Sequence, residues 1–240
     1  MKHILITIAF FSSFSAFAVT KQLKLGFAFS PGIGWLAPQG KELKKANPRF
    51  YADYGLVVEY FFKPNYGIST GISGSYEGGN ITGRKTFESR SVNLKQVNEQ
   101  YIIQTLALPI ALKLKTNEIK KKFHFYGQVG FTFNFYVSSR ANFSDAITEE
   151  GNPAVAVSIE KENIYRKDNE VRRLIPKFRS NFADVRLQVG AGVEYKLNDK
   201  TFLLMGIYFN NGLVNVIKDY DAKNEKIYFR NVALRMGVLF

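Results

Sequence analysis

Apolar and polar residues alternate with a period of two along most of this chain. Such alternation indicates β-strands, because successive side chains point to opposite faces of an extended backbone. The last stretch, Lys226 to Phe240, shows it clearly. One face carries the apolar residues Val232, Leu234, Met236, Val238 and Phe240, and the other carries Asn231, Ala233, Arg235 and Gly237. A strand with one apolar face and one face bearing an arginine is typical of a membrane barrel, which has lipid outside and a polar interior.

The same period predicts eight strands, separated by stretches that lack it. The predicted strands span about residues 23–35, 50–62, 66–77, 101–115, 123–137, 182–197, 201–211 and 226–240. Long connections follow the first, third, fifth and seventh strands, and short ones follow the others. Short periplasmic turns that alternate with longer extracellular loops are typical of outer-membrane barrels. We therefore predict an all-β fold: an eight-stranded antiparallel transmembrane β-barrel of the outer-membrane type with four long extracellular loops.

The predicted extracellular loops cover residues 36–49, 78–100, 138–180 and 212–225. In the fourth predicted strand, Pro109 cannot donate a ladder hydrogen bond, so we expect a bulge there. A soluble lipocalin-like barrel also has eight strands, but it would place its apolar face inside around a ligand. The polar and glycine-rich inner faces of most predicted strands favour the membrane barrel.

The N-terminus indicates export. Lys2 precedes an apolar run from Ile4 to Phe17, and Ala16-Phe17-Ala18 fits cleavage before Val19. The run is shorter than the roughly 20 residues of a spanning helix. We predict a signal peptide at residues 1–18 and a barrel domain at residues 19–240, located in the cell outer membrane. No later stretch approaches a hydrophobic helix, so a mature membrane protein of this sequence has to be a barrel.

Composition removes several function classes. The chain has no cysteine, which excludes disulfides, thiolate metal sites and a cysteine nucleophile. Its net charge of +13 is spread through loops and strand faces, without a basic helix or an aromatic RNA-binding motif, so we expect no nucleic-acid partner. For an exported basic protein, the expected contact of this charge is anionic lipopolysaccharide or a charged solute, and the barrel is expected to lie in outer-membrane lipid.

Charged residues on the inner faces are the main candidate site. They are Lys24, Glu59, Lys113, Asp184, Arg186, Glu194 and Arg235. Buried charges must pair in so narrow a lumen, and eight strands leave little more than side-chain volume. We therefore favour a plug of ion pairs, in which Arg235 meets Glu59 or Glu194. The alternative is a narrow porin-like channel for small solutes.

Catalysis has one weak candidate. His124 is the histidine that the mature chain keeps, at the expected periplasmic end of the fifth predicted strand. A serine–histidine–acid site would need a serine at hydrogen-bonding distance, and a lone histidine is a poor metal site. We expect a structural histidine, no enzymatic activity, no metal and no cofactor; a lipid-modifying enzyme is the remaining alternative.

Four segments carry a resemblance to a known family. Residues 106–115 (LALPIALKLK), 190–195 (GAGVEY), 208–213 (YFNNGL) and 231–240 (NVALRMGVLF) resemble the PorT-type outer-membrane β-barrel domains of Bacteroidota. The resemblance covers nearly the whole mature chain and implies an integral outer-membrane protein. It also implies that Phe240 is the signal that the barrel-assembly machinery recognises. The namesake is tied to secretion and maturation of exported proteases, but most relatives have no assigned role.

Recognition is expected in the loops, because loops on a rigid scaffold carry function. The longest predicted loop, 138–180, holds a basic cluster of Arg166, Lys167, Arg172, Arg173, Lys177 and Arg179. We expect this cluster to face lipopolysaccharide or an envelope protein partner. The protein is expected to be a monomer with a structural or interaction role.

Overall fold

The structure of the protein is a computed structural model that describes residues 23–39, 43–45, 47–87, 92–120, 122–148, 159–161, 179–218 and 226–240. The signal peptide predicted at residues 1–18 lies outside these ranges. Every regular element within them is a β-strand. In this part of the chain no helix has the length and hydropathy needed to cross a membrane.

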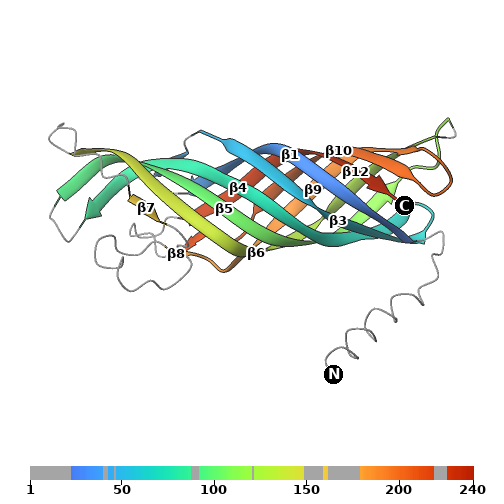
Figure 1. The fold of residues 1–240 in the computed structure, drawn as a ribbon, viewed down its shortest axis with the longest axis horizontal. Helices are drawn as coiled ribbons and strands as arrows, with labels where there is room; N and C mark the ends of the chain where they lie inside the picture. Colours follow the sequence, from blue (N-terminus) through green and yellow to red (C-terminus); the bar gives the residue numbers. More distant parts are fainter. Residues whose placement is uncertain are drawn as a thin grey trace, which may run out of the picture.

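Eight strands form a closed barrel, as predicted. They are β1 (Leu23–Gln39), β3 (Arg49–Lys63), β4 (Tyr66–Phe87), β5 (Val92–Lys115), β6 (Phe123–Thr148), β9 (Ala183–Lys196), β10 (Phe202–Gly212) and β12 (Lys226–Leu239). Their order around the ring is β4-β3-β1-β12-β10-β9-β6-β5, and β5 pairs with β4 to close it. All these pairings are antiparallel. Figure 1 shows the strands tilted around a common long axis.

Four short strands lie at one end of the barrel. They are β2 (Leu43–Lys45), β7 (Ile159–Lys161), β8 (Arg179–Ser180) and β11 (Ile217–Lys218). β2 pairs with β4, β7 pairs with β6, and β8 pairs with β11. We call this the extracellular end and the opposite end, which has the short turns and both Leu23 and Phe240, the periplasmic end.

The last strand closes the barrel. β12 pairs with β1 from Gly26↔Leu239 to Gln39↔Lys226. Beyond the ladder, the Leu25 N–H donates to the Phe240 carbonyl at 3.0 Å, and the Phe240 N–H donates to the Leu25 carbonyl at 2.7 Å. The terminal residue is therefore part of the wall rather than a free tail.

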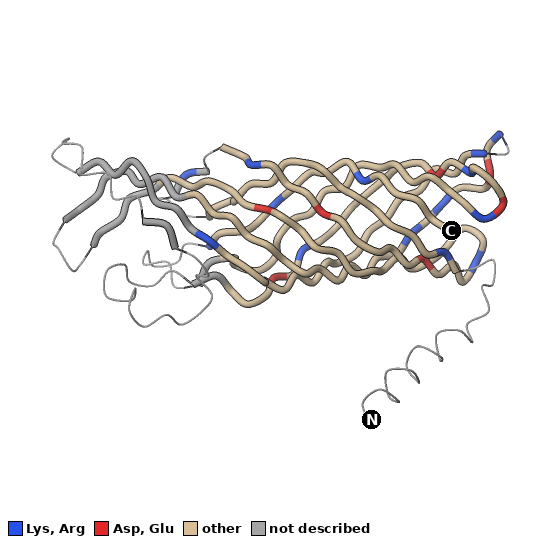
Figure 2. The backbone as a smooth tube through the Cα atoms, viewed as in Figure 1, with Lys and Arg blue, Asp and Glu red and all other residues tan. Residues whose placement is uncertain are grey.

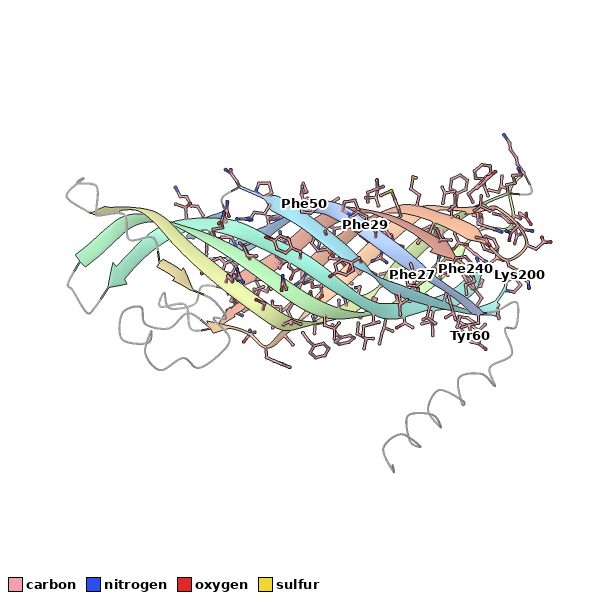
Figure 3. The ribbon with its side chains drawn as sticks, in the orientation of Figure 1. Phe27, Phe29, Phe50, Tyr60, Lys200 and Phe240 are labelled. Atoms are coloured by element: carbon pink, nitrogen blue, oxygen red, sulfur yellow. The ribbon has the colours of Figure 1, made fainter. Side chains whose placement is uncertain are left out.

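The outer wall is apolar. Large apolar side chains of every barrel strand are exposed, and Phe27, Phe29 and Phe50 stand on the wall in Figure 3. In β12 the outward residues Val232, Leu234 and Met236 belong to the predicted apolar set. An exposed apolar band around a closed barrel is the surface that lipid covers.

Two predicted loops are partly strand. Residues 78–100 contain the ends of β4 and β5, which pair from Glu77↔Ile103 to Phe87↔Val92. β6 continues to Thr148, well into the predicted loop 138–180. In Figure 1 these three strands run past the others at the extracellular end. The predicted bounds of these two loops were wrong, because a strand that leaves the lipid no longer needs an apolar outer face. The membrane pattern therefore stops before the strand does.

The predicted bulge at Pro109 is also wrong. Pro109 pairs with Thr132 of β6, and the β4–β5 register is the same on both sides of it. The ladder towards β4 is merely interrupted, between Thr70↔Ile110 and Ser73↔Ala107. The Thr70 hydroxyl donates to the Pro109 carbonyl at 2.8 Å. A side-chain donor thus occupies the proline carbonyl, and the strand needs no extra residue.

Candidate functional site

The structure places all seven predicted inner-face charges inside the barrel. Lys24, Glu59, Lys113, Asp184, Arg186 and Glu194 are buried, and the Arg235 side chain is 12% exposed. Strand alternation brings them inward from β1, β3, β5, β9 and β12. They form three groups along the barrel axis.

The first group lies towards the periplasmic end. The Lys113 ammonium is 2.5 Å from Glu59 Oε1 and 2.5 Å from Glu194 Oε1. Lys24 Nζ lies 2.8 Å from Glu194 Oε2. These contacts link β5 with β3, β5 with β9, and β1 with β9, so they cross the lumen instead of following one face of the sheet.

Aromatic rings surround this periplasmic group. Lys113 Nζ lies 4.3 Å from the centre of the Tyr126 ring, and Lys24 Nζ lies 3.5 Å from that of Phe202. Each ammonium faces a π surface as well as a carboxylate, which is favourable where water is excluded. Carboxylates and rings together fill the cross-section at this level.

The second group is centred on Arg186. Its Nη1 and Nη2 each donate to Glu77 at 2.6 Å, while Nη2 and Nε donate to Asp184 at 2.7 and 3.0 Å. Asp184 also accepts from the Tyr136 hydroxyl at 2.8 Å and from the Asn134 amide at 2.6 Å. All three guanidinium nitrogens are bonded, and such bidentate pairs are among the strongest in proteins.

Sequence reasoning missed Glu77. It lies two residues after Ser75 at the end of the third predicted strand, and it is buried to 1% exposure. Glu77 lies an even number of residues from Ser75, so both side chains point to the inner face of the strand. The sequence therefore contained a usable signal for Glu77. Its partner Arg186 on β9 could not be found from sequence, because the pair joins strands that are not neighbours in the barrel.

The third group holds Arg235, and the predicted partner was wrong. Arg235 Nη2 lies 3.9 Å from Asp53 Oδ1, Nε donates to the Ser30 hydroxyl at 3.2 Å, and the guanidinium lies 4.1 Å from the Tyr208 ring centre. Glu59 instead pairs with Lys113, and Glu194 pairs with both Lys113 and Lys24. Asp53 lies an even number of residues from Glu59 on β3, so both side chains point into the lumen.

A hydrogen-bonded layer of neutral side chains lies beside these charges. The Tyr208 hydroxyl donates to Gln128 at 3.1 Å, Gln128 to Gln188 at 3.2 Å, Gln188 to Asn210 at 3.2 Å, and Asn210 to Asn231 at 2.8 Å. The chain runs over β10, β6, β9 and β12. Side chains that are bonded to one another across strands rigidify the interior they fill.

The extracellular end of the lumen is closed by apolar packing, which was not predicted. The buried side chains there are Leu36, Tyr51, Ile81, Tyr101, Ile103, Val216, Ile227 and Phe229, and we call them the apolar cap. The inner face of β5 changes from Thr105 and Ala107 to Tyr101 and Ile103, while Gln104 turns outward. This inversion is the pattern of a water-soluble sheet, and it marks the level at which the strands leave the membrane.

A close backbone approach completes the cap. At Gly79 of β4, an added Cβ would lie 2.5 Å from the backbone nitrogen of Leu36 on β1. Only glycine leaves room for two strands to meet at this distance. Thus β1 and β4 come together beyond Arg49, where β3 begins, and the buried apolar cap lies at this end of the lumen.

A small cavity lies beside Arg235 inside the barrel. A cavity of about 20 Å³ lies beside Asp53, Ser69, Pro109 and Arg235. That volume suits about one water molecule. It adjoins the interrupted stretch of the β4–β5 ladder.

His124 lies at the periplasmic end and stabilises a turn. Its Nδ1 lies 3.0 Å from the Thr116 carbonyl, and its ring centre is 6.3 Å from that of Phe202. Within the described ranges, no group of three or more histidine, cysteine, aspartate or glutamate side chains is arranged to hold a metal ion.

Most of the predicted basic loop cluster lies outside the described residues. This applies to Arg166, Lys167, Arg172, Arg173 and Lys177. Arg179 begins β8, and its backbone pairs with Lys218 of β11. That short ladder fixes the point at which the chain returns to the barrel.

Comparison with known proteins agrees with this architecture. The family model of the outer membrane protein beta-barrel domain matches residues 11–218. No curated protein matches the chain.

Among solved structures, the chain is similar to three outer-membrane proteins at low identity. The attachment invasion locus protein Ail of Yersinia pestis is 14% identical, with 91% of this chain and 99% of Ail covered and a TM-score of 0.36. Neisserial surface protein A is 9% identical, with 92% and 96% covered and a TM-score of 0.44. OprG from Pseudomonas aeruginosa is 12% identical, with 91% and 95% covered and a TM-score of 0.44.

Proposed function

This chain belongs to the outer membrane protein beta-barrel domain family, and we propose that it serves in the outer membrane as a closed barrel with a structural or interaction role. The observation that supports closure is the series of obstructions along the lumen. These obstructions are the ion pairs around Lys113, the contacts of Arg235 with Asp53 and Ser30, the ion pairs around Arg186, and the apolar cap. A solute would have to displace all four.

Energetics favour a plug over a channel. Removing one partner from a buried ion pair costs about 3–5 kcal/mol, because an uncompensated charge remains in a low-dielectric site. Glu194 alone is contacted by both Lys113 and Lys24, so opening a path there disturbs several charges together. The cavity of about 20 Å³ beside Arg235 is too small for a hydrated ion.

The interaction role belongs to the extracellular end. The apolar cap gives that end a core of its own, so the emerging strands form a rigid support. Loops on such a support are suited to recognition. We assign the basic loop residues Arg166, Lys167, Arg172, Arg173, Lys177 and Arg179 to contact with lipopolysaccharide or an envelope protein partner, the barrel itself being a monomer in outer-membrane lipid.

A link to protein secretion is the finer part of the proposal. Its support is the resemblance of residues 106–115, 190–195 and 208–213 to PorT-type barrels. Deleting the protein from its own cell should lower the amount of exported protease in the medium. An unchanged amount, with an intact outer membrane, argues against the link.

Solute uptake tests the closed lumen. Proteoliposomes containing the folded protein should swell no faster in a small sugar than protein-free liposomes, whereas a porin reconstituted in the same way should accelerate swelling. Fast swelling with the wild-type protein contradicts the plug and favours the porin-like alternative.

Two further measurements separate the remaining roles. A photo-crosslinker placed at exposed Arg140 or in residues 166–179 should capture lipopolysaccharide or an envelope protein in intact cells. No capture at any of these positions counts against the interaction role. Esterase or acyl-transfer activity that disappears in His124→Ala would instead identify a lipid-modifying enzyme.

A further inference from the structure

The periplasmic end carries four lysines that face no carboxylate among the described residues. They are Lys63, Lys120, Lys122 and Lys200, all exposed, and we call them the periplasmic lysine collar. Two acidic side chains of the same turns, Glu118 and Asp199, lie 3.9 and 3.0 Å from a fifth lysine, Lys196. Figure 2 shows segments coloured for Lys or Arg at the turns of the end where the C-terminus lies. The collar therefore has an uncompensated positive charge.

The collar lies at the edge of the apolar band. Lys63 is followed by a two-residue turn, and its neighbours Phe62 and Tyr66 are 46% and 49% exposed. Lys122 Nζ lies 3.4 Å from the Tyr195 hydroxyl and 5.8 Å from that ring's centre. Tyr60 and Lys200 are labelled towards this same end in Figure 3. Aromatic rings and lysines at one level are typical of the membrane–water interface.

We propose that the periplasmic lysine collar binds the phosphate groups of anionic phospholipids in the inner leaflet of the outer membrane. A lysine ammonium is a compact charge that pairs readily with phosphate, and its aliphatic stem packs on apolar surface. Four such groups around one rim select lipids with a net negative charge over zwitterionic lipids.

Position favours lipid over the cell wall. Peptidoglycan also carries anionic groups, namely carboxylates, but it lies beyond the headgroup layer. The turn at Pro64 and Asn65 is too short to lift Lys63 away from the band formed by Phe62 and Tyr66. Lys122 likewise rests against Tyr195. Both ammonium groups are therefore held at headgroup depth. This inference goes beyond the proposed function and does not depend on a closed lumen.

Lipid titration tests the collar directly. Short-chain phosphatidylglycerol is added to the folded protein in a non-ionic detergent, with phosphatidylcholine as reference, and bound lipid is counted by mass spectrometry of the intact complex. The test variant combines Lys63→Gln, Lys120→Gln, Lys122→Gln and Lys200→Gln. We expect the wild type to prefer phosphatidylglycerol and the variant to lose about fivefold in affinity per lysine removed.

Three controls make the result specific. Arginine at the same four positions should retain the preference, because the charge remains. Lys44→Gln, Arg49→Gln and Lys226→Gln at the extracellular end should also leave it unchanged. A gel comparing boiled with unboiled protein verifies that every variant is folded.

The proposal fails under either of two outcomes. One is an unchanged phosphatidylglycerol preference in the four-glutamine variant. The other is an equal loss in the extracellular control, which would mean that net charge alone attracts the lipid. If wild-type protein but not the four-glutamine variant sediments with purified peptidoglycan, while lipid binding stays unchanged, the collar's partner is the cell wall.

Discussion

Lys113 shows how a single residue controls the interior of this barrel. It is fully buried at 0% exposure and contacts two glutamates from different strands, Glu59 and Glu194. Each of those carboxylates was transferred out of water when the barrel formed. Glu59 therefore depends on the Lys113 ammonium for its counter-charge, whereas Glu194 also pairs with Lys24.

Replacing Lys113 by methionine should be strongly destabilising. Lys113→Met keeps the length of the side chain but leaves the buried Glu59 without a counter-charge and Glu194 with Lys24 alone, so we expect a loss of about 3–5 kcal/mol in the free energy of unfolding. Denaturant titration of the protein in lipid vesicles measures it. Lys44→Met, at an exposed lysine, is the control. Equal losses in the two variants would contradict the account.

The same residue allows a double-mutant test. Adding Glu59→Gln to Lys113→Met removes the buried charge that the first substitution leaves without a partner, so the double variant should be more stable than the sum of the single effects predicts, by about 0.5–3 kcal/mol. Strict additivity would mean that Lys113 and Glu59 do not interact energetically.

The alternation of side chains between the two faces of a strand provides most of what the sequence reveals about individual residues. It placed Lys24, Lys113 and Arg186 inside the barrel, and applied one step further it would have added Asp53 and Glu77. The ion-pair partners of these residues could not be predicted in the same way. Glu77 meets Arg186 across the lumen, and that contact depends on the width and stagger of the closed barrel. The alternation within a single strand gives neither the width nor the stagger of the barrel.

At the scale of elements, the strands were located well inside the membrane and poorly outside it. The lipid imposes an apolar outer face on residues 106–114, which makes that part of β5 easy to recognise. Beyond the membrane the outer face of β5 carries Gln104 and the inner face carries Tyr101. Apolar side chains face inward there and polar ones outward. Without the membrane pattern, the first part of β5, residues 92–100, looks like a loop in the sequence.

Gly79 tests the contact between β1 and β4. In Gly79→Ala the new Cβ meets backbone, which cannot move aside, so we expect a loss of about 1–3 kcal/mol in the free energy of unfolding. Gly74→Ala on the same strand is the control, because its Cβ would lie 3.5 Å from the Tyr54 ring, an ordinary contact. If Gly79→Ala is tolerated as well as Gly74→Ala, the two strands are not closely packed at the cap.

The closing strand gives a second test at this scale. Deleting Phe240 removes both hydrogen bonds with Leu25 and the terminal aromatic residue, so we expect assembly into the cell membrane to fall more than the stability of barrels already formed. The folded fraction in membranes, read from gel migration before and after boiling, measures assembly. Phe240→Tyr should restore it. Normal insertion of the truncated chain would rule out an assembly role for Phe240.

At the scale of the whole molecule, the barrel consists of three zones along its axis. Exposed lysines lie at the periplasmic rim, paired charges lie inside the barrel within the membrane, and the buried apolar cap lies at the extracellular end. The closed ring leaves no free edge between β1 and β12. We propose that such a molecule holds a surface in place and does not conduct solute.

Electrical recording in planar bilayers tests this closure most directly. With folded wild-type protein on one side and a monovalent salt on both, the account predicts no steady current above that of a protein-free bilayer. A porin inserted under the same conditions provides the positive control. Stable conductance steps whose size increases with salt concentration would contradict a lumen closed by its ion pairs and apolar cap.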